Sequence, residues 1–413
     1  MQAWWSRGPS LGTRSYDGRV PVELSSATDR RLADVDALTG PVPAVAGHPL
    51  VLAARDVAAR WAEDAETVDQ VGVDRARVDL AARAGLLGVT APTEHGGGGA
   101  PAPVARAVTE LLAGACGTTW FVTAQHAMPL GVVLHAADRS AAAPWVRPLS
   151  EASTLAAIAV SHVRRGGPPA VTAERDGAGW RVDGSVGWLT SWGLADVLLL
   201  AARSGGSLVM ALLPAHDLPG ATAGEPMRLA AMQGTRTTTM VLDGLHVRAG
   251  QVLEVVAAQE WLAADAARTA NVVPAVFGLL ASLCRGLVSA SSRPGAGAAA
   301  EVGLRAAEQG ASLRERAYRM LDELPPTEGV EDRLRLRAEA LHLLVSTSGA
   351  LVAAWAGAAM SLDHPAQRYA REALFHLVQA QTPPVRAATL EVWAGRTAAV
   401  GLSVPGRAPS PTR

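Results

Sequence analysis

Lysine is absent from the 413-residue chain, so its 37 basic residues are all arginine. They are balanced by 38 acidic residues, and a chain of near-zero net charge has no general attraction to nucleic acid or to an anionic membrane. We therefore expect neither as a partner. Arginine does suit phosphate recognition, because its planar guanidinium can bind two oxygen atoms at once.

Cysteine is also scarce. Cys116 and Cys284 are too few and too far apart for a disulfide framework or a zinc site, so we expect no metal and a reducing, cytoplasmic location. The N-terminus lacks the continuous apolar stretch of a signal peptide. An uncharged run at 343–362 has the length of a membrane span, but its serine, threonine and small residues favour a helix buried among other helices.

Apolar residues make up 49% of the chain, enough for a substantial core in two or three domains. The first 45 residues have no sustained period and predict a mobile extension. Helical spacing follows to about residue 153, with one helical stretch from Val104 to Ala115 continuing toward Leu134. The tetraglycine 96–99 lacks the lysine and hydroxyl of a phosphate-binding loop and predicts a turn.

From 154 to 250 the apolar period changes to two, which is typical of strands separated by glycine-rich turns. In the segment W-R-V-D-G-S-V-G-W-L-T-S-W-G, residues Trp180, Val182, Val186 and Trp188 fall at even spacing. They predict one face of two strands, joined by a hairpin turn at Asp183-Gly184.

After Leu253 the apolar residues recur at spacings of three and four, which predicts long helices packed on one another. Pro274 should kink the first of them. A second helix is expected to end at the prolines after Leu324, a third to extend to Leu362, and a fourth to follow Pro365.

These patterns predict an α+β fold with an N-terminal helical domain, a middle β-barrel or β-sandwich domain and a C-terminal four-helix bundle. The expected boundaries are 1–45 for the extension, 46–153, 154–250 and 251–395 for the three domains, and 396–413 for a flexible tail.

Four motifs occur in an order typical of one family. The tripeptide W-L-T at 188–190 resembles the tryptophan-x-threonine signature of the acyl-CoA dehydrogenases. Segments 92–99, 232–247 and 364–373 resemble that family's proline-x-glutamate-x-glycine-glycine turn, its glycine-x-arginine strand pair and its arginine-acid helix. The resemblance covers most of 50–390. It implies the fold predicted above, a flavin cofactor (FAD, with FMN possible), an acyl-CoA or related small molecule as substrate, and an electron-transfer partner.

The resemblance also implies cofactor contacts. Trp188 would pack beside the flavin ring, and the Thr190 hydroxyl would bond its N5 edge. The remaining cofactor-binding positions would be Val160 and Ser161 at the pyrimidine edge, Thr382 at the diphosphate or ribose, and Gly357 at the adenosine half.

The family's catalytic carboxylate has no counterpart. Alignment without gaps places Ala380 where most dehydrogenases carry a glutamate base, and Arg268 where other members carry it. Glu260, Asp265 and His376 are the candidate substitutes, and we favour His376 because its pKa is near neutrality. Its spacing from a preceding arginine resembles that of the family's monooxygenase branch. The alternative is a partly buried structural histidine.

The family's glutamate-proline-glycine flavin loop is replaced by H-V-R-R-G-G after Ser161. Arg164 and Arg165 could serve instead as a diphosphate clamp, or could form a solvated turn. The arginine-x-x-phenylalanine-glycine segment expected after Arg285 is also absent.

Three functions remain open. The leading hypothesis is a flavin-dependent oxidoreductase of acyl-CoA dehydrogenase type, acting on the CH–CH bond of an acyl thioester. The second is a flavin-dependent monooxygenase of the same fold, and the third is a non-catalytic subunit paired with a complete paralogue. The apolar surface of the C-terminal helices predicts a homodimer or homotetramer.

Overall fold

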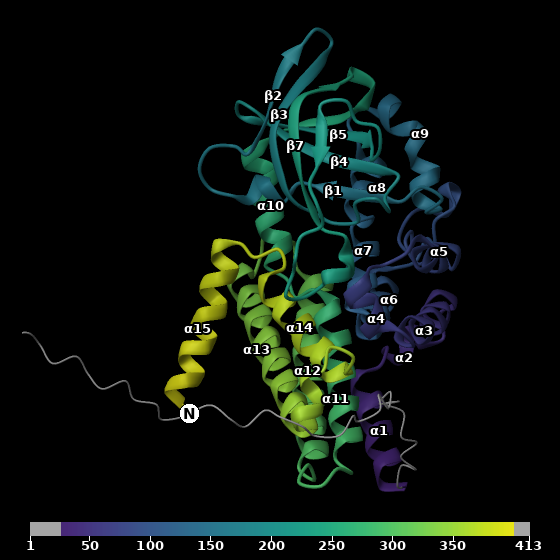
Figure 1. Ribbon diagram of the computed structural model, residues 1–413, viewed down its shortest axis with the longest axis vertical. Helices are drawn as coiled ribbons and strands as arrows, with labels where there is room; N and C mark the ends of the chain where they lie inside the picture. The colour runs from purple at the N-terminus through teal and green to yellow at the C-terminus, as the bar shows by residue number, and fades with distance from the viewer. Residues whose placement is uncertain (1–25, 400–413) are drawn as a thin grey trace, which may run out of the picture.

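The computed structural model describes residues 26–399, with a sheet at one end and long helices at the other (Figure 1). The N-terminal helices lie alongside both parts. They are α1 (Ser26–Thr39), α2 (Pro43–Ala46), α3 (Pro49–Ala62), α4 (Ala65–Val71), α5 (Arg75–Arg83), η1 (Thr93–His95), α6 (Ala102–Ala115), α7 (Gly117–Ala124), α8 (Ala127–His135) and α9 (Arg139–Ser150).

The predicted extension is wrong for its second half, because residues 26–39 form α1 and 43–46 form α2. Val35 is fully buried and belongs to the same apolar core as the C-terminal helices. Residues 1–25 lie outside the described residues. The helical stretch expected at Val104–Ala115 is α6, and the helical character expected to continue toward Leu134 is confirmed as α7 and α8. Cys116 has an extended backbone between α6 and α7.

The middle domain is one eight-stranded sheet. Its strands are β1 (Ala156–Ala159), β2 (Val171–Asp176), β3 (Gly179–Leu189), β4 (Val197–Ser204), β5 (Ser207–Pro214), β6 (Ala221–Ala223), β7 (Thr238–Val247) and β8 (Val252–Ala257). The order is β6-β7-β3-β2-β4-β5-β8, with β1 parallel to β4. Helices α8 and α9 pack against apolar residues of β1, β4, β5 and β8 in one core. The sheet extends to Ala257, beyond the expected boundary at 250.

The hairpin expected at Asp183-Gly184 does not exist. Strand β3 continues through both residues, and the register against β7 shifts between Val182 and Gly184. Gly184 has φ of +134°, and a Cβ there would lie 2.1 Å from the carbonyl oxygen of Ala170. Glycine is therefore required for a bulge and not for a turn.

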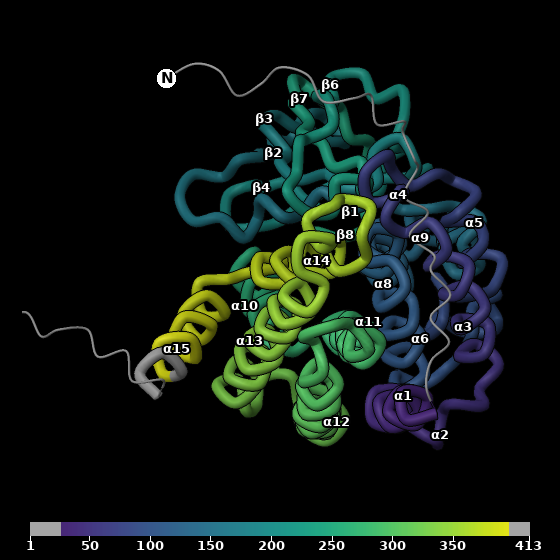
Figure 2. The backbone as a smooth tube through the Cα atoms, turned by 60° about the horizontal axis from the view of Figure 1, so that its bottom comes forward, coloured from purple at the N-terminus to yellow at the C-terminus, as the bar shows by residue number. Residues whose placement is uncertain are grey.

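The C-terminal part contains α10 (Ala258–Thr269), α11 (Pro274–Ala290), α12 (Ala299–Glu323), α13 (Val330–Trp355), η5 (Ala356–Met360), α14 (Pro365–Val378) and α15 (Pro383–Ala399). Figure 2 shows α11, α12, α13 and α14 as the bundle, with α10 and α15 outside it. Pro274 does not kink a helix, because it begins α11, where its missing N–H costs nothing. The predicted flexible tail is wrong for 396–399, which are helical.

Two helical stretches, 258–290 and 330–360, are long and apolar enough to cross a membrane by length and composition. In the first, 72% of the most apolar window is buried inside the protein; in the second, 28% is. The expectation that 343–362 is buried among other helices is therefore wrong for much of its surface. Helix α13 also ends at Trp355, before the uncharged run does.

Helices α6 and α11 cross closely at two glycines. A Cβ on Gly278 would lie 2.0 Å from the carbonyl oxygen of Glu110, and one on Gly114 would lie 2.6 Å from the carbonyl oxygen of Gly278. Ser282 adds a 2.7 Å hydrogen bond to the Gly114 carbonyl oxygen. This crossing joins the N-terminal domain to the bundle.

Candidate functional site

The W-L-T motif ends β3 where the three parts of the chain meet. The next residue, Ser191, donates its hydroxyl to the carbonyl oxygen of Val122 on α7 (3.2 Å) and its N–H to the carbonyl oxygen of Thr235. On the other side of α7, Trp120 packs against His376 near the end of α14. We call this region, formed by residues 188–191, α7 and the end of α14, the junction.

Trp188 is exposed and its backbone is strained. Its side chain is 51% exposed and its φ is +62°, a left-handed conformation that is rare for a bulky side chain. A register shift between Val186 and Leu189 turns it away from the buried face. The predicted common face of Trp180, Val182, Val186 and Trp188 is therefore wrong for its last member.

The two predicted hydroxyl ligands are hydrogen-bonded within the chain. Thr190 is buried and shares a 2.9 Å hydrogen bond with the Thr237 hydroxyl. Ser161 donates to the carbonyl oxygen of Gly187 (2.9 Å), just before Trp188. Val160 is fully buried beside it. The segment 160–161 therefore lies against the end of β3 at residues 187–190.

His376 is not placed to act as a base. It is 2% exposed, its ring lies 5.8 Å from that of Trp120 and 5.5 Å from that of Phe375, and its Nδ1 lies 3.3 Å from Oε1 of Gln379. Burial lowers its pKa to about 4. The ring is therefore a neutral part of an aromatic cluster, and the structural alternative describes it better.

The carboxylates offered as substitutes are also unsuitable. Asp265 is 2% exposed and accepts bidentate hydrogen bonds from Arg164, at 2.6 and 2.9 Å, and a further one from Arg268. Glu260 lies exposed on the first turn of α10. Ala380, in the loop after α14, brings no ionisable group. Among the described residues that we proposed as bases, none combines a free carboxylate with access to the junction.

The arginine pair divides into two roles. Arg164 holds Asp265 and thereby ties the loop after β1 to α10. Arg165 is exposed, and its Nη2 lies 3.0 Å from the position that a Cβ on Gly187 would take. Within the described residues its side chain makes no hydrogen bond or ion pair, and its backbone N–H donates to the carbonyl oxygen of His162. Only Arg165 is therefore free in the way that the clamp hypothesis requires.

Gly357 and Thr382 do not meet within one chain. Arg337, near the start of α13, donates to the carbonyl oxygen of Gln379 (2.6 Å), close to Thr382. Gly357 follows the other end of α13 and has no atom within 4 Å of where its Cβ would lie. At 1.5 Å per helical residue, Arg337 and the end of α13 at Trp355 lie about 27 Å apart. The structure thus leaves Gly357 outside the junction.

A buried acid on α14 was missed by sequence reasoning. Glu372 is 1% exposed, and its Oε1 accepts hydrogen bonds from the N–H of Gly117 (3.1 Å) and from Arg368 (2.8 Å), while its Oε2 has no partner among the described residues. Desolvation raises its pKa to about 7. Its only sequence signal is the acid after Arg371, within the arginine-acid motif already noted.

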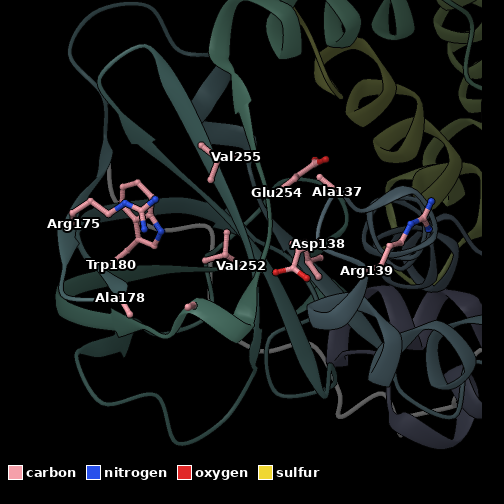
Figure 3. Close-up of a pocket in the computed structure, with 11 residues that line it drawn as sticks. Ala137, Asp138, Arg139, Arg175, Ala178, Trp180, Val252, Glu254 and Val255 are labelled. Carbon is pink, nitrogen blue, oxygen red and sulfur yellow. The ribbon is translucent and has the colours of Figure 1, made fainter.

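A cavity of about 540 Å³ lies away from the junction, between β8, the start of α9 and the β2–β3 turn (Figure 3). Arg175 and Trp180 both line the cavity, and the guanidinium of Arg175 lies over the Trp180 ring, 4.0 Å from the ring centre. Asp138 and Glu254 contribute carboxylates to its lining. None of the catalytic or cofactor-binding residues predicted from the sequence lines this cavity.

Comparison with known proteins agrees with this architecture. Residues 50–152 match the family described as "Acyl-CoA dehydrogenase, N-terminal domain". Human mitochondrial short-chain specific acyl-CoA dehydrogenase is 24% identical over 177 residues, which are 41% of this chain and 43% of that protein. The chain thus matches less than half the length of this curated relative.

Solved structures extend the likeness to the whole fold. A glutaryl-CoA dehydrogenase with glutaryl-CoA superposes with a TM-score of 0.70 at 16% identity, covering 95% of this chain and 100% of that one. The dibenzothiophene monooxygenase of Paenibacillus sp. A11-2 gives 0.65 at 19% identity, covering 88% and 99%. The fold is that of the acyl-CoA dehydrogenase-like flavoproteins. The N-terminal region of the chain matches that family's N-terminal domain, and the chain as a whole shares the acyl-CoA dehydrogenase fold.

Proposed function

We propose that the protein is a flavin-dependent oxidoreductase of the acyl-CoA dehydrogenase type, with an acyl thioester or related small molecule as substrate. The observation that carries the proposal is Trp188, a large aromatic side chain left half exposed on a strained backbone at the junction. Strain of this kind persists where the surrounding structure enforces it, often at functional sites. FAD is the proposed cofactor, FMN its alternative, and an electron-transfer protein the proposed partner.

The residues at the junction fit a planar aromatic cofactor. The exposed indole of Trp188 offers a stacking surface, and the Ser161 hydroxyl, which donates to Gly187, keeps its lone pairs available to accept a hydrogen bond. Such a cofactor supplies two-electron redox chemistry. The protein would hold it with Trp188, Thr190 and the backbone at Val160–Ser161.

A flavin-dependent monooxygenase is the second candidate, because the expected base is missing. Ala380 cannot take a proton, Asp265 is held by two arginines, and burial lowers the pKa of His376 to about 4. A reaction that does not begin with abstraction of an α-proton does not need a general base at these positions. The structural likeness to the dibenzothiophene monooxygenase agrees with this candidate.

The absorbance spectrum of the purified protein tests both candidates. A flavin spectrum bleached anaerobically by an acyl-CoA supports the dehydrogenase, and we expect Ala380→Glu to increase the bleaching rate. A flavin spectrum that acyl-CoA leaves unchanged, together with oxygen consumption when the flavin is supplied reduced, supports the monooxygenase. A colourless protein that binds neither FAD nor FMN contradicts both and favours a non-catalytic subunit.

A further inference from the structure

Two arginines bind a single buried carboxylate beside the junction, and two more arginines lie near it. Arg164, at the end of the short helix η2 (Ser161–Arg164), and Arg268 on α10 both bind Asp265. Arg337 on α13 donates to the carbonyl oxygens of Thr269 and Gln379. Arg165 follows directly in the chain. We call residues 164, 165, 268 and 337 the arginine cluster.

The charge of the arginine cluster is poorly balanced. Burial, with a smaller contribution from the nearby guanidinium of Arg164, lowers the pKa of Arg337 to about 10. Its two hydrogen bonds go to neutral carbonyl oxygens. Asp265 is the one carboxylate that binds cluster members among the described residues, so a net positive charge remains.

Two members of the arginine cluster are open to solvent. The side chain of Arg268 is 55% exposed, with one of its nitrogens on Asp265. Arg165 is exposed and unpaired within the described residues, and it lies against Gly187, next to Trp188. By contrast Arg164 is 20% exposed and is fully engaged by its bidentate pair. An incoming anion would therefore meet Arg165 and Arg268, with the buried members adding to the attraction.

We propose that Arg165 and Arg268 bind the phosphate of an organic ligand whose other end lies at the junction, while Asp265 holds Arg164 and Arg268 in place. Guanidinium groups suit this role because they form short, charge-assisted hydrogen bonds to phosphate oxygens. The site deepens the proposed function and rests on it in part. The phosphate belongs either to the flavin or to the diphosphate of an acyl-CoA.

Calorimetric titration of the full chain with inorganic pyrophosphate, FMN, riboflavin and coenzyme A tests the site. We expect Arg165→Gln and Arg268→Gln each to weaken pyrophosphate binding about tenfold, and the double variant to lose it. Arg181→Gln, at an exposed arginine near the start of β3, is the matched control and should bind as the wild type does. Binding to the wild type should also weaken with added salt.

The other ligands identify the source of the phosphate. If the double variant no longer binds FMN more tightly than riboflavin, the phosphate is the flavin's. If it no longer binds coenzyme A but keeps the preference for FMN, the phosphate is the substrate's. Pyrophosphate bound equally by the wild type and the double variant overturns the site, even if flavin binding persists. Arginine-dependent pyrophosphate binding by a protein that binds no flavin keeps the site and removes the proposed cofactor.

Discussion

Glu372 and His376 lie one helical turn apart on α14. Burial shifts the pKa of each side chain in the direction that favours its neutral form. The pKa of Glu372 rises from 4.5 to about 7, and that of His376 falls from 6.5 to about 4. Glu372 thus contributes stability that is present below pH 4.5 and is lost as the pH rises toward 7. His376 contributes stability that is present above pH 6.5 and is lost as the pH falls toward 4.

Because these two contributions have opposite slopes between pH 4.5 and 6.5, we expect them to cancel in the wild type. Glu372→Gln should leave the His376 slope, so that the unfolding free energy rises with pH relative to the wild type. His376→Phe should leave the Glu372 slope, so that the unfolding free energy falls with pH relative to the wild type. Each difference should be on the order of 1 kcal/mol per pH unit, measured by urea unfolding. The same pH dependence in all three proteins would contradict the pKa shifts.

Trp188 allows strain to be separated from binding. Trp188→Gly and Trp188→Ala both remove the indole, and both should lose flavin retention. They differ in that glycine accepts a φ of +62° without a steric penalty, whereas alanine does not. We expect the glycine variant to be more stable than the alanine variant by about 1 kcal/mol, measured by urea unfolding. An alanine variant of equal stability would show that the backbone there is unstrained.

The crossing of α6 and α11 depends on glycine. Gly278→Ala places a Cβ 2.0 Å from the carbonyl oxygen of Glu110, so the helices must separate. We expect a loss of about 2 kcal/mol or more in unfolding free energy. Gly349→Ala is the matched control, because no atom lies within 4 Å of that position on α13. It should stabilise the protein by up to about 1 kcal/mol through helix propensity.

Helix α13 and its neighbours present an apolar surface that one chain does not cover. The exposed large side chains after residue 355 are Met360, Leu362, Leu374, Val378, Leu390 and Trp393. Helices α14 and α15, which carry most of them, both pack on α13. Apolar side chains gathered in this way are typical of a protein interface.

We expect the protein to form a homodimer or homotetramer through this surface. Val378→Asp and Leu390→Asp, at positions 64% and 63% exposed, should shift it toward monomer with little loss of secondary structure. Leu52→Asp, at a position on α3 that is 47% exposed, is the control and should keep the wild-type mass. Light scattering at micromolar concentration measures the difference. A monomeric wild type would contradict the prediction.

The sequence by itself determined the order of the helical and β regions and the fold class. Changes of apolar period mark the sheet and the long helices, because periods of 2 and 3.6 residues reflect local backbone geometry. The spacing of W-L-T and three further motifs along the chain predicted the acyl-CoA dehydrogenase fold without any tertiary information, and the solved structures share it. In the structure the segment that follows β1 lies against the end of β3, where Ser161 donates a hydrogen bond to the carbonyl oxygen of Gly187. The predicted contacts of Val160, Ser161, Trp188 and Thr190 with a cofactor stay a prediction.

Only the tertiary structure decided which of the candidate side chains are free to contact a ligand or to exchange a proton. A bulge turned Trp188 to the surface, and bulges depend on how a partner strand pairs. From the sequence, His376 and Asp265 were both candidate bases. In the folded protein His376 is buried beside Trp120, and Asp265 is paired with Arg164. Burial and ion pairing arise from segments far apart in the chain, so no local pattern encodes them.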